Sequence, residues 1–172
     1  MESAQRASTF VQDLVSLARK TDTQTNVLIA PLVDSAIASI TPVFGSRVNV
    51  QRTPFPSEPL KGSPERLQQL FLNLLLLVCT HPKTRGIGID CVRLGTNLRL
   101  IFRSSNELNL STFESMPIKA IFSQKGGHWM ALAVAACHRI AREHRGTVVA
   151  RSVGAGAEIE VEVAVAEVET GD

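Results

Sequence analysis

The chain has 172 residues, which is enough for one domain with its own hydrophobic core. Hydrophobic residues make up 44% of it, a share that excludes a disordered chain. The formal net charge is only +2 and no block of like charges occurs, which argues against nucleic acid as a partner. Three cysteines without metal-ligand spacing predict reduced thiols in a cytoplasmic protein, and no apolar run is long enough to span a membrane.

The first part of the chain predicts two helices and two short strands. Residues 3–20 have a helical apolar period, which places several apolar side chains on one face: Ala7, Phe10, Val11, Leu14 and Leu17. The elements expected next are a strand at 25–29, a helix from about Pro31 to Phe44 ended by Gly45, and a strand at 47–51. Three prolines over 54–59 then predict an extended loop.

The second part predicts long helices and two hairpins. Ser63 and Pro64 are typical of a helix start, and the helix is expected to continue to about Thr80. The elements expected next are strands at 87–93 and 97–103, an irregular polar segment at 104–125, a helix at 127–144 and two strands joined by a glycine-rich turn. In the last strand, valine and isoleucine alternate with Glu158, Glu160 and Glu162, which predicts one buried and one wet face. This order favours an α+β two-layer sandwich, with helices on one face of a mixed, mostly antiparallel sheet.

Two motifs carry a resemblance to a known family. The stretch 122–165 contains a Gly-Gly pair before a helix, then His144-Arg145-Gly146 and two strands, and the stretch 66–75 reads RLQQLFLNLL. Together they resemble the ATP-binding domain of sensor histidine kinases, within the wider family of gyrase-type and Hsp90-type ATPases. The resemblance implies a Bergerat-like fold over residues 23–168, preceded by part of a dimerisation helix at 1–22 and followed by a tail at 169–172.

The resemblance also implies where Mg²⁺ and adenine are expected to bind, and both positions depart from the family pattern. Active members carry two asparagines one turn apart on one helix, because Mg²⁺ prefers oxygen ligands. Asn73 matches the first asparagine, but Leu77 stands at the second and cannot coordinate a cation. The family's adenine-binding aspartate follows a strand, and Ser104 stands at this position with no glycines after it.

The expected phosphate cradle departs from the pattern as well. In the family, glycines at a helix start expose backbone N–H groups to the phosphates. Gly127 matches the first glycine of this motif and could bind phosphate together with Lys125 and Gly126, whereas Trp129 and Ala131 stand at later glycine positions. The prediction is therefore that neither ATP nor Mg²⁺ binds.

The retained residues also have structural interpretations, which stay open beside the functional ones. Asn73 is either a core amide bonded to nearby backbone or a residual nucleotide contact. The segment 125–127 is either a helix-start turn or a retained phosphate-binding turn. Trp129 either fills the empty nucleotide pocket or anchors a partner protein. His144 is expected to suit the negative end of a helix dipole. The stripe of Glu158, Glu160 and Glu162 is either an exposed sheet face or a docking surface.

These expectations favour a non-catalytic histidine-kinase-like domain that acts as an interaction or regulatory module in signalling. Its partners are expected to be a second copy or a larger parent protein, joined through the apolar face of residues 3–20, and a signalling protein. One alternative is a divergent ATP-dependent histidine kinase. Another is a phosphotransferase, which would need an upstream histidine-bearing helix. Nucleic-acid binding is the weakest alternative, because the arginines are scattered.

Overall fold

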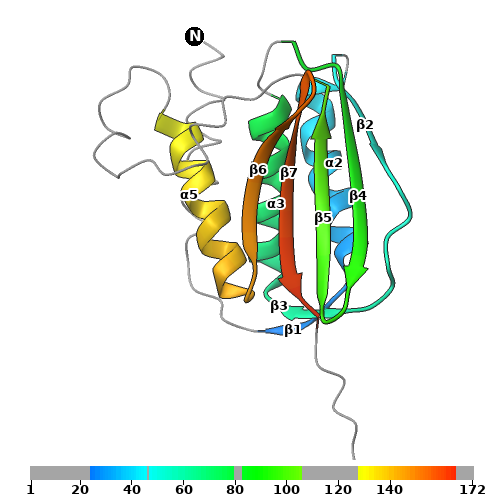
Figure 1. Ribbon diagram of the computed structural model, residues 1–172, viewed down its shortest axis with the longest axis vertical. Coiled ribbons are helices and arrows are strands. Elements are labelled where there is room, and N and C mark those ends of the chain that lie inside the picture. The colour runs from blue at the N-terminus through cyan, green and yellow to red at the C-terminus, as the bar shows by residue number, and fades with distance from the viewer. Residues whose placement is uncertain (1–23, 46, 80–82, 106–127, 166–172) are drawn as a thin grey trace, which may run out of the picture.

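The computed structural model describes residues 24–45, 47–79, 83–105 and 128–165. Three described helices and seven strands make up the fold (Figure 1). Their bounds are β1 Thr25–Val27, α2 Ile29–Phe44, β2 Asn49–Arg52, β3 Leu60–Gly62, α3 Pro64–Cys79, β4 Gly86–Leu94, β5 Asn97–Ser104, α5 His128–Glu143, β6 Thr147–Val153 and β7 Gly156–Ala164. The predicted α+β class is therefore confirmed, and the first predicted helix lies outside the described residues.

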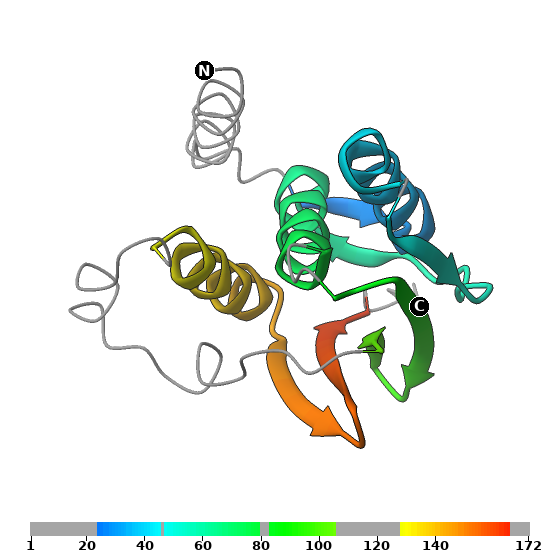
Figure 2. The same cartoon turned by 90° about the horizontal axis from the view of Figure 1, so that it is seen from above.

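The strands form one large and one small sheet. The large sheet has the order β2-β4-β5-β7-β6, in which only β2 and β4 are parallel, and β1 pairs with β3 in a separate antiparallel ribbon. The described helices α2, α3 and α5 all cover the same face of the large sheet, and its other face carries no described helix (Figures 1 and 2). This is the predicted two-layer arrangement.

The core lies between this sheet and α3. The inner face of β5 and β7 brings Phe102 opposite Ile159 and Leu100 opposite Val161, as the alternating pattern predicts. Helix α3 packs against α2 and α5, and its side chains are buried around most of its circumference. Phe71 of α3 stacks on Phe102 with ring centroids 6.5 Å apart. Helix α3 is thus the central helix, and α2, α5 and the sheet all pack against it.

Two-residue turns close both predicted hairpins. Gly95 begins the turn between β4 and β5, and Gly154 begins the turn between β6 and β7, each with φ of 59°. Glycine adopts this left-handed conformation without steric cost, and at the first turn position it is typical of a type II′ hairpin. The strand expected at 25–29 forms as β1, whereas its partner β3 was not predicted, because a three-residue strand is too short to show a period.

His144 is buried at the end of α5 and binds backbone groups of two helical segments. Its Nδ1 donates to the carbonyl of Ile140 at 2.8 Å, and the backbone N–H of Ser63 donates to its Nε2 at 3.2 Å. The two bonds fit the neutral tautomer with its proton on Nδ1. The ring therefore donates to a carbonyl at the end of α5, as an imidazole at this helix end is expected to do, and it also joins α5 to the start of α3.

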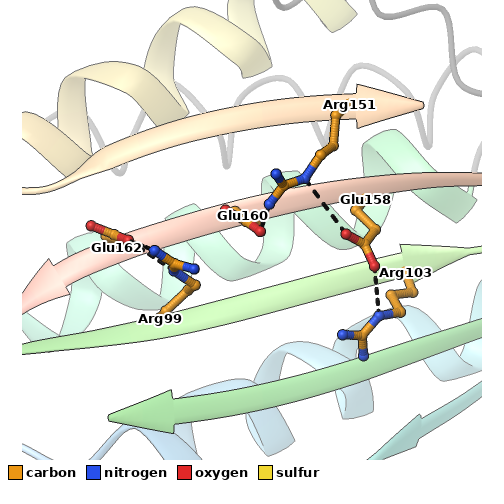
Figure 3. Close-up of polar contacts among 6 residues, drawn as sticks. All are labelled: Arg99, Arg103, Arg151, Glu158, Glu160 and Glu162. Atoms are coloured by element: carbon orange, nitrogen blue, oxygen red, sulfur yellow. Dashed lines mark hydrogen bonds and ion pairs between the residues drawn. The ribbon is translucent and has the colours of Figure 1, made fainter. Parts of the chain in front are cut away.

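The carboxylate stripe on the outer face of the sheet is an ion-pair ladder (Figure 3). Glu158 binds Arg103 at 2.7 Å and Arg151 at 3.6 Å, and Glu162 binds Arg99 at 2.6 Å. Arg151 also pairs with Glu160. The glutamates bind arginines of the neighbouring strands, so this face is wet as predicted but its charges are already matched within the sheet. The ladder does not favour the docking interpretation of the stripe.

The three cysteines are buried and free, as expected. Burial raises the pKa of Cys79 and of Cys91 to about 11, and it also raises the pKa of Cys137. The thiols are therefore neutral at physiological pH and behave as small apolar side chains. Within the described ranges, no cluster of His, Cys, Asp and Glu side chains could hold a metal ion. No helix of this part of the chain is long and apolar enough to cross a membrane.

Candidate functional site

Three elements that carry candidate site residues meet at one end of the molecule. Helix α3 ends there, strand β5 ends there, and helix α5 begins there (Figure 1). Helix α3 also packs on both α5 and β5. This convergence places Leu77, Ser104 and Ala131 at the same end of the fold, and Asn73 lies one helical turn before Leu77 on α3.

Asn73 of α3 is the most unusual residue of this region. Its side chain is almost fully enclosed, with 1% of the residue exposed. Neither Nδ2 nor Oδ1 has a hydrogen-bond partner in the part of the chain that the structure describes. An enclosed amide without partners costs about 1–3 kcal/mol of stability. The expectation that nearby backbone satisfies this amide is therefore not met by the described residues.

Gln69 lies one helical turn before Asn73 and was not singled out from the sequence. It is also buried, and its Oε1 accepts no hydrogen bond from the described residues, although Gln69 is held by another interaction. The spacing of four residues places the two amides on the same face of α3. A signal was available in the sequence, because two amides four apart in an otherwise apolar helix mark a polar strip.

Leu77 continues this face by one more turn and belongs to the hydrophobic core. It is 6% exposed, and its neighbour Leu76 is also buried. A magnesium ion requires several oxygen ligands and usually retains bound water. At this position the helix offers the amide oxygen of Asn73 in a leucine-rich environment. The described residues therefore do not fit a magnesium site of the expected type.

Ser104 occupies the position expected for the adenine-binding carboxylate. It is the last residue of β5, lies opposite Ala157 of β7 and Ile87 of β4, and is 6% exposed. Its hydroxyl is short and uncharged, so it cannot supply the charge-assisted bond that a carboxylate gives to an amino group. The described residues do not fit adenine recognition through this position.

The start of α5 is described only in part. Helix α5 begins at His128, and Ala131 in its first turn is 4% exposed, so a methyl group is packed where the family pattern has a glycine. Lys125, Gly126 and Gly127 lie outside the described residues, as do the side chains of His128 and Trp129. The two interpretations of the phosphate cradle therefore both stay open.

The fold is that of the ATP-binding domain of histidine kinases. The chain is similar to the mycobacterial sensor histidine kinase MprB, with a TM-score of 0.64 and 13% identity over 83% of this chain and 98% of that chain. It is also similar to the ATP-binding domain of PrrB from Mycobacterium tuberculosis, with a TM-score of 0.64 and 17% identity over 85% and 100% of the two chains. A third similar structure is full-length ShkA in complex with AMPPNP, with a TM-score of 0.70 and 19% identity over 97% of this chain and 37% of that one.

Sequence comparisons add nothing to this structural similarity. No protein-family profile matches the chain, and no curated protein matches it in sequence. At identities of 13–19%, the similarity establishes the fold of a histidine-kinase catalytic domain, which is found in bacterial signalling proteins. The activity has to be argued from the residues at the site.

Proposed function

We propose that this domain is a non-catalytic member of the histidine-kinase fold, that it does not bind Mg-ATP, and that it acts through protein–protein contacts in cytoplasmic bacterial signalling. The observation that carries the proposal is the environment of Asn73, which is only 1% exposed and lies one helical turn from the core residue Leu77. A ligand to a hydrated cation has to face a water-accessible pocket. Ser104 supports the same conclusion, because it offers no carboxylate for adenine.

We further propose that the chain, or a larger parent protein, dimerises through its N-terminal helix. The proposal rests on the apolar helical period of residues 3–20, which lie outside the described part of the chain. A charge in the centre of such a seam is costly, because it would be buried without a partner. Size-exclusion chromatography with light scattering should therefore show a dimer for the natural chain and a monomer for Leu14→Asp. If the natural chain has the mass of a monomer in this measurement, the proposed dimer is wrong.

The loss of nucleotide binding is tested by thermal unfolding with ATP and ADP, each with and without Mg²⁺. A ligand present at about 100 times its Kd stabilises the folded state by about 2.7 kcal/mol, which for a domain of this size is a shift of roughly 5–10 °C. We expect no shift of the melting temperature at millimolar Mg-ATP. A Mg-dependent shift of several degrees would show that the domain still binds nucleotide.

A divergent ATP-dependent histidine kinase is the second candidate. It is favoured by the amide of Asn73, which would gain hydrogen-bond partners if a nucleotide and its cation entered this region. In this case the region has to open before binding, because the amide is enclosed. The thermal unfolding experiment separates the two candidates directly.

A further inference from the structure

Strand β6 is an edge of the large sheet, and no described strand pairs with its outer side (Figure 1). Helix α5 lies beside it, but in the layer of the helices rather than in the plane of the strands (Figure 2). Val153 and Gly156 flank the two-residue turn between β6 and β7, so these two residues exchange both backbone hydrogen bonds. Because bonding groups alternate along a strand, the N–H and C=O groups of Val148, Ala150 and Ser152 point to the open side.

The sequence of β6 has none of the features that usually protect an edge strand. Natural proteins shorten such strands, interrupt them with proline or a bulge, or place lysine on them. β6 has seven residues without proline, glycine or lysine, and its register with β7 runs without a bulge. The strand at the other edge, β2, has four residues. Two β-branched side chains of β6 also stay exposed, Val149 by 53% and Val153 by 47%. β6 is therefore a template on which a further strand can form.

The backbone of this edge is self-complementary. Its outward groups are centred on Ala150, so a two-fold axis at Ala150 pairs this residue with itself and pairs Val148 with Ser152. Every outward N–H and C=O group of both copies then has a hydrogen-bond partner. Ala150 has the smallest side chain of the strand and packs against the core on the inner face, so it leaves room for a second copy at the axis.

The side chains of the outer face match in the same register. Val149 comes to lie opposite Arg151 of the second copy, where it can pack on the aliphatic part of the arginine. Val153 comes to lie opposite Thr147 of the second copy, and pairs of β-branched residues are favourable across strands. Both exposed valines of β6 therefore gain a cross-strand partner.

The charges of the edge also favour a second copy over a strongly charged partner. Arg151 is the only ionisable residue of β6. It already binds Glu158 at 3.6 Å and also pairs with Glu160, both on β7 of the same copy (Figure 3). Two of these arginines can therefore lie near the axis with their charges matched. A strongly charged segment would find no unmatched charge on this strand, whereas an identical neutral edge fits it.

We infer that β6 pairs with β6 of a second copy, antiparallel and in register about Ala150, which joins the sheets of two domains into one. One strand per copy is a small contact, at the low end of the range for specific interfaces, so the association is expected to be weak and to need high protein concentration. The inference goes beyond the proposed dimer, because it uses a surface other than residues 3–20. Two separate contacts between copies let dimers of a signalling module assemble further.

The inference is tested on the full chain with Leu14→Asp, in which the proposed seam of residues 3–20 is broken. Sedimentation equilibrium from about 10 μM to about 1 mM protein should show association that increases with concentration. Adding Val149→Lys should weaken this association by roughly 10-fold or more, because it places lysine on the edge and opposite Arg151 of the second copy. The matched control is Val92→Lys, which changes an exposed valine on the same face of β4 and should leave the association unchanged.

The register is tested by NMR on an equal mixture of isotope-labelled and unlabelled chains. Val149 of one copy and Arg151 of the other form a non-hydrogen-bonded pair with Cα atoms about 4.5 Å apart, so a nuclear Overhauser effect between their Hα protons is expected across the two chains. No association up to millimolar protein, equal effects of the two lysine variants, or contacts between copies at other elements overturns the inference. The proposed seam fails separately, if the natural chain and Leu14→Asp have the same mass at micromolar concentration.

Discussion

Gly146→Ala is expected to destabilise the domain by about 3 kcal/mol, near the upper end of the range for overpacked sites. A Cβ atom at Gly146 would lie 1.8 Å from the carbonyl oxygen of Glu162 in β7, which is backbone and cannot rotate away. The backbone at Gly146 is held by the end of α5 as well as by the contact with β7. Arg145 has φ of 54°, and the N–H of Gly146 donates to the carbonyl of Ala141 at 2.8 Å, in the pattern of a Schellman helix end.

The matched control for this change is Gly88→Ala. Gly88 lies in β4, and a Cβ atom there would meet only the Cβ of Arg103, at 3.9 Å. The same added methyl group should therefore leave the free energy of unfolding almost unchanged. Urea unfolding of both variants measures the difference. Equal stabilities for the two variants would show that β7 does not pass next to the end of α5 as the structure has it.

Asn73→Leu is expected to stabilise the domain by about 1–3 kcal/mol, an unusual direction for a change in a core. Leucine has the same branching at Cγ as asparagine and replaces two unpartnered polar atoms with methyl groups. Its new neighbours would be leucines of the same helix, such as Leu77. Removing a polar group that has no partner removes its desolvation cost and adds apolar contact.

Asn73→Asp is the control, because it retains the shape and places an unpaired charge in the core. It should lower the free energy of unfolding by several kcal/mol at neutral pH, by the mechanism that makes unpaired buried charges strongly destabilising. Denaturant titrations should give the highest stability for Asn73→Leu, an intermediate value for the natural chain and the lowest for Asn73→Asp. A large loss of stability in Asn73→Leu would mean that the amide is satisfied in solution, by ordered water or by a ligand.

Regular periods explain why most of the fold could be predicted from the sequence. The helical period in 64–79 extends over more than two turns, and the alternation in 156–164 extends over four apolar–polar pairs. Both elements form where the sequence predicts them. The first strand of the ribbon was predicted at 25–29, but β3 and its pairing with β1 could not be predicted, because the paired residues lie 33 to 37 positions apart in strands of three residues. The role of His144 depends on Ser63, which is distant in sequence, and no local pattern indicates this contact.

The candidate site was predicted less well than the fold, for a physical reason. Motif spacing located Asn73, Leu77 and Ser104 on the correct elements, because helix and strand registers follow from periodicity. It could not indicate whether the Asn73 amide had a partner, because this depends on packing from other elements.

Isothermal titration calorimetry with Mg²⁺ and the non-hydrolysable analogue adenylyl imidodiphosphate tests the loss of the nucleotide site most directly. If the enclosed amide of Asn73 is out of reach of a hydrated cation and Ser104 cannot recognise adenine, injections up to millimolar analogue should give only the heat of dilution. A saturable one-to-one isotherm with a Kd in the micromolar range, which weakens when Asn73 is replaced by leucine, would contradict this account.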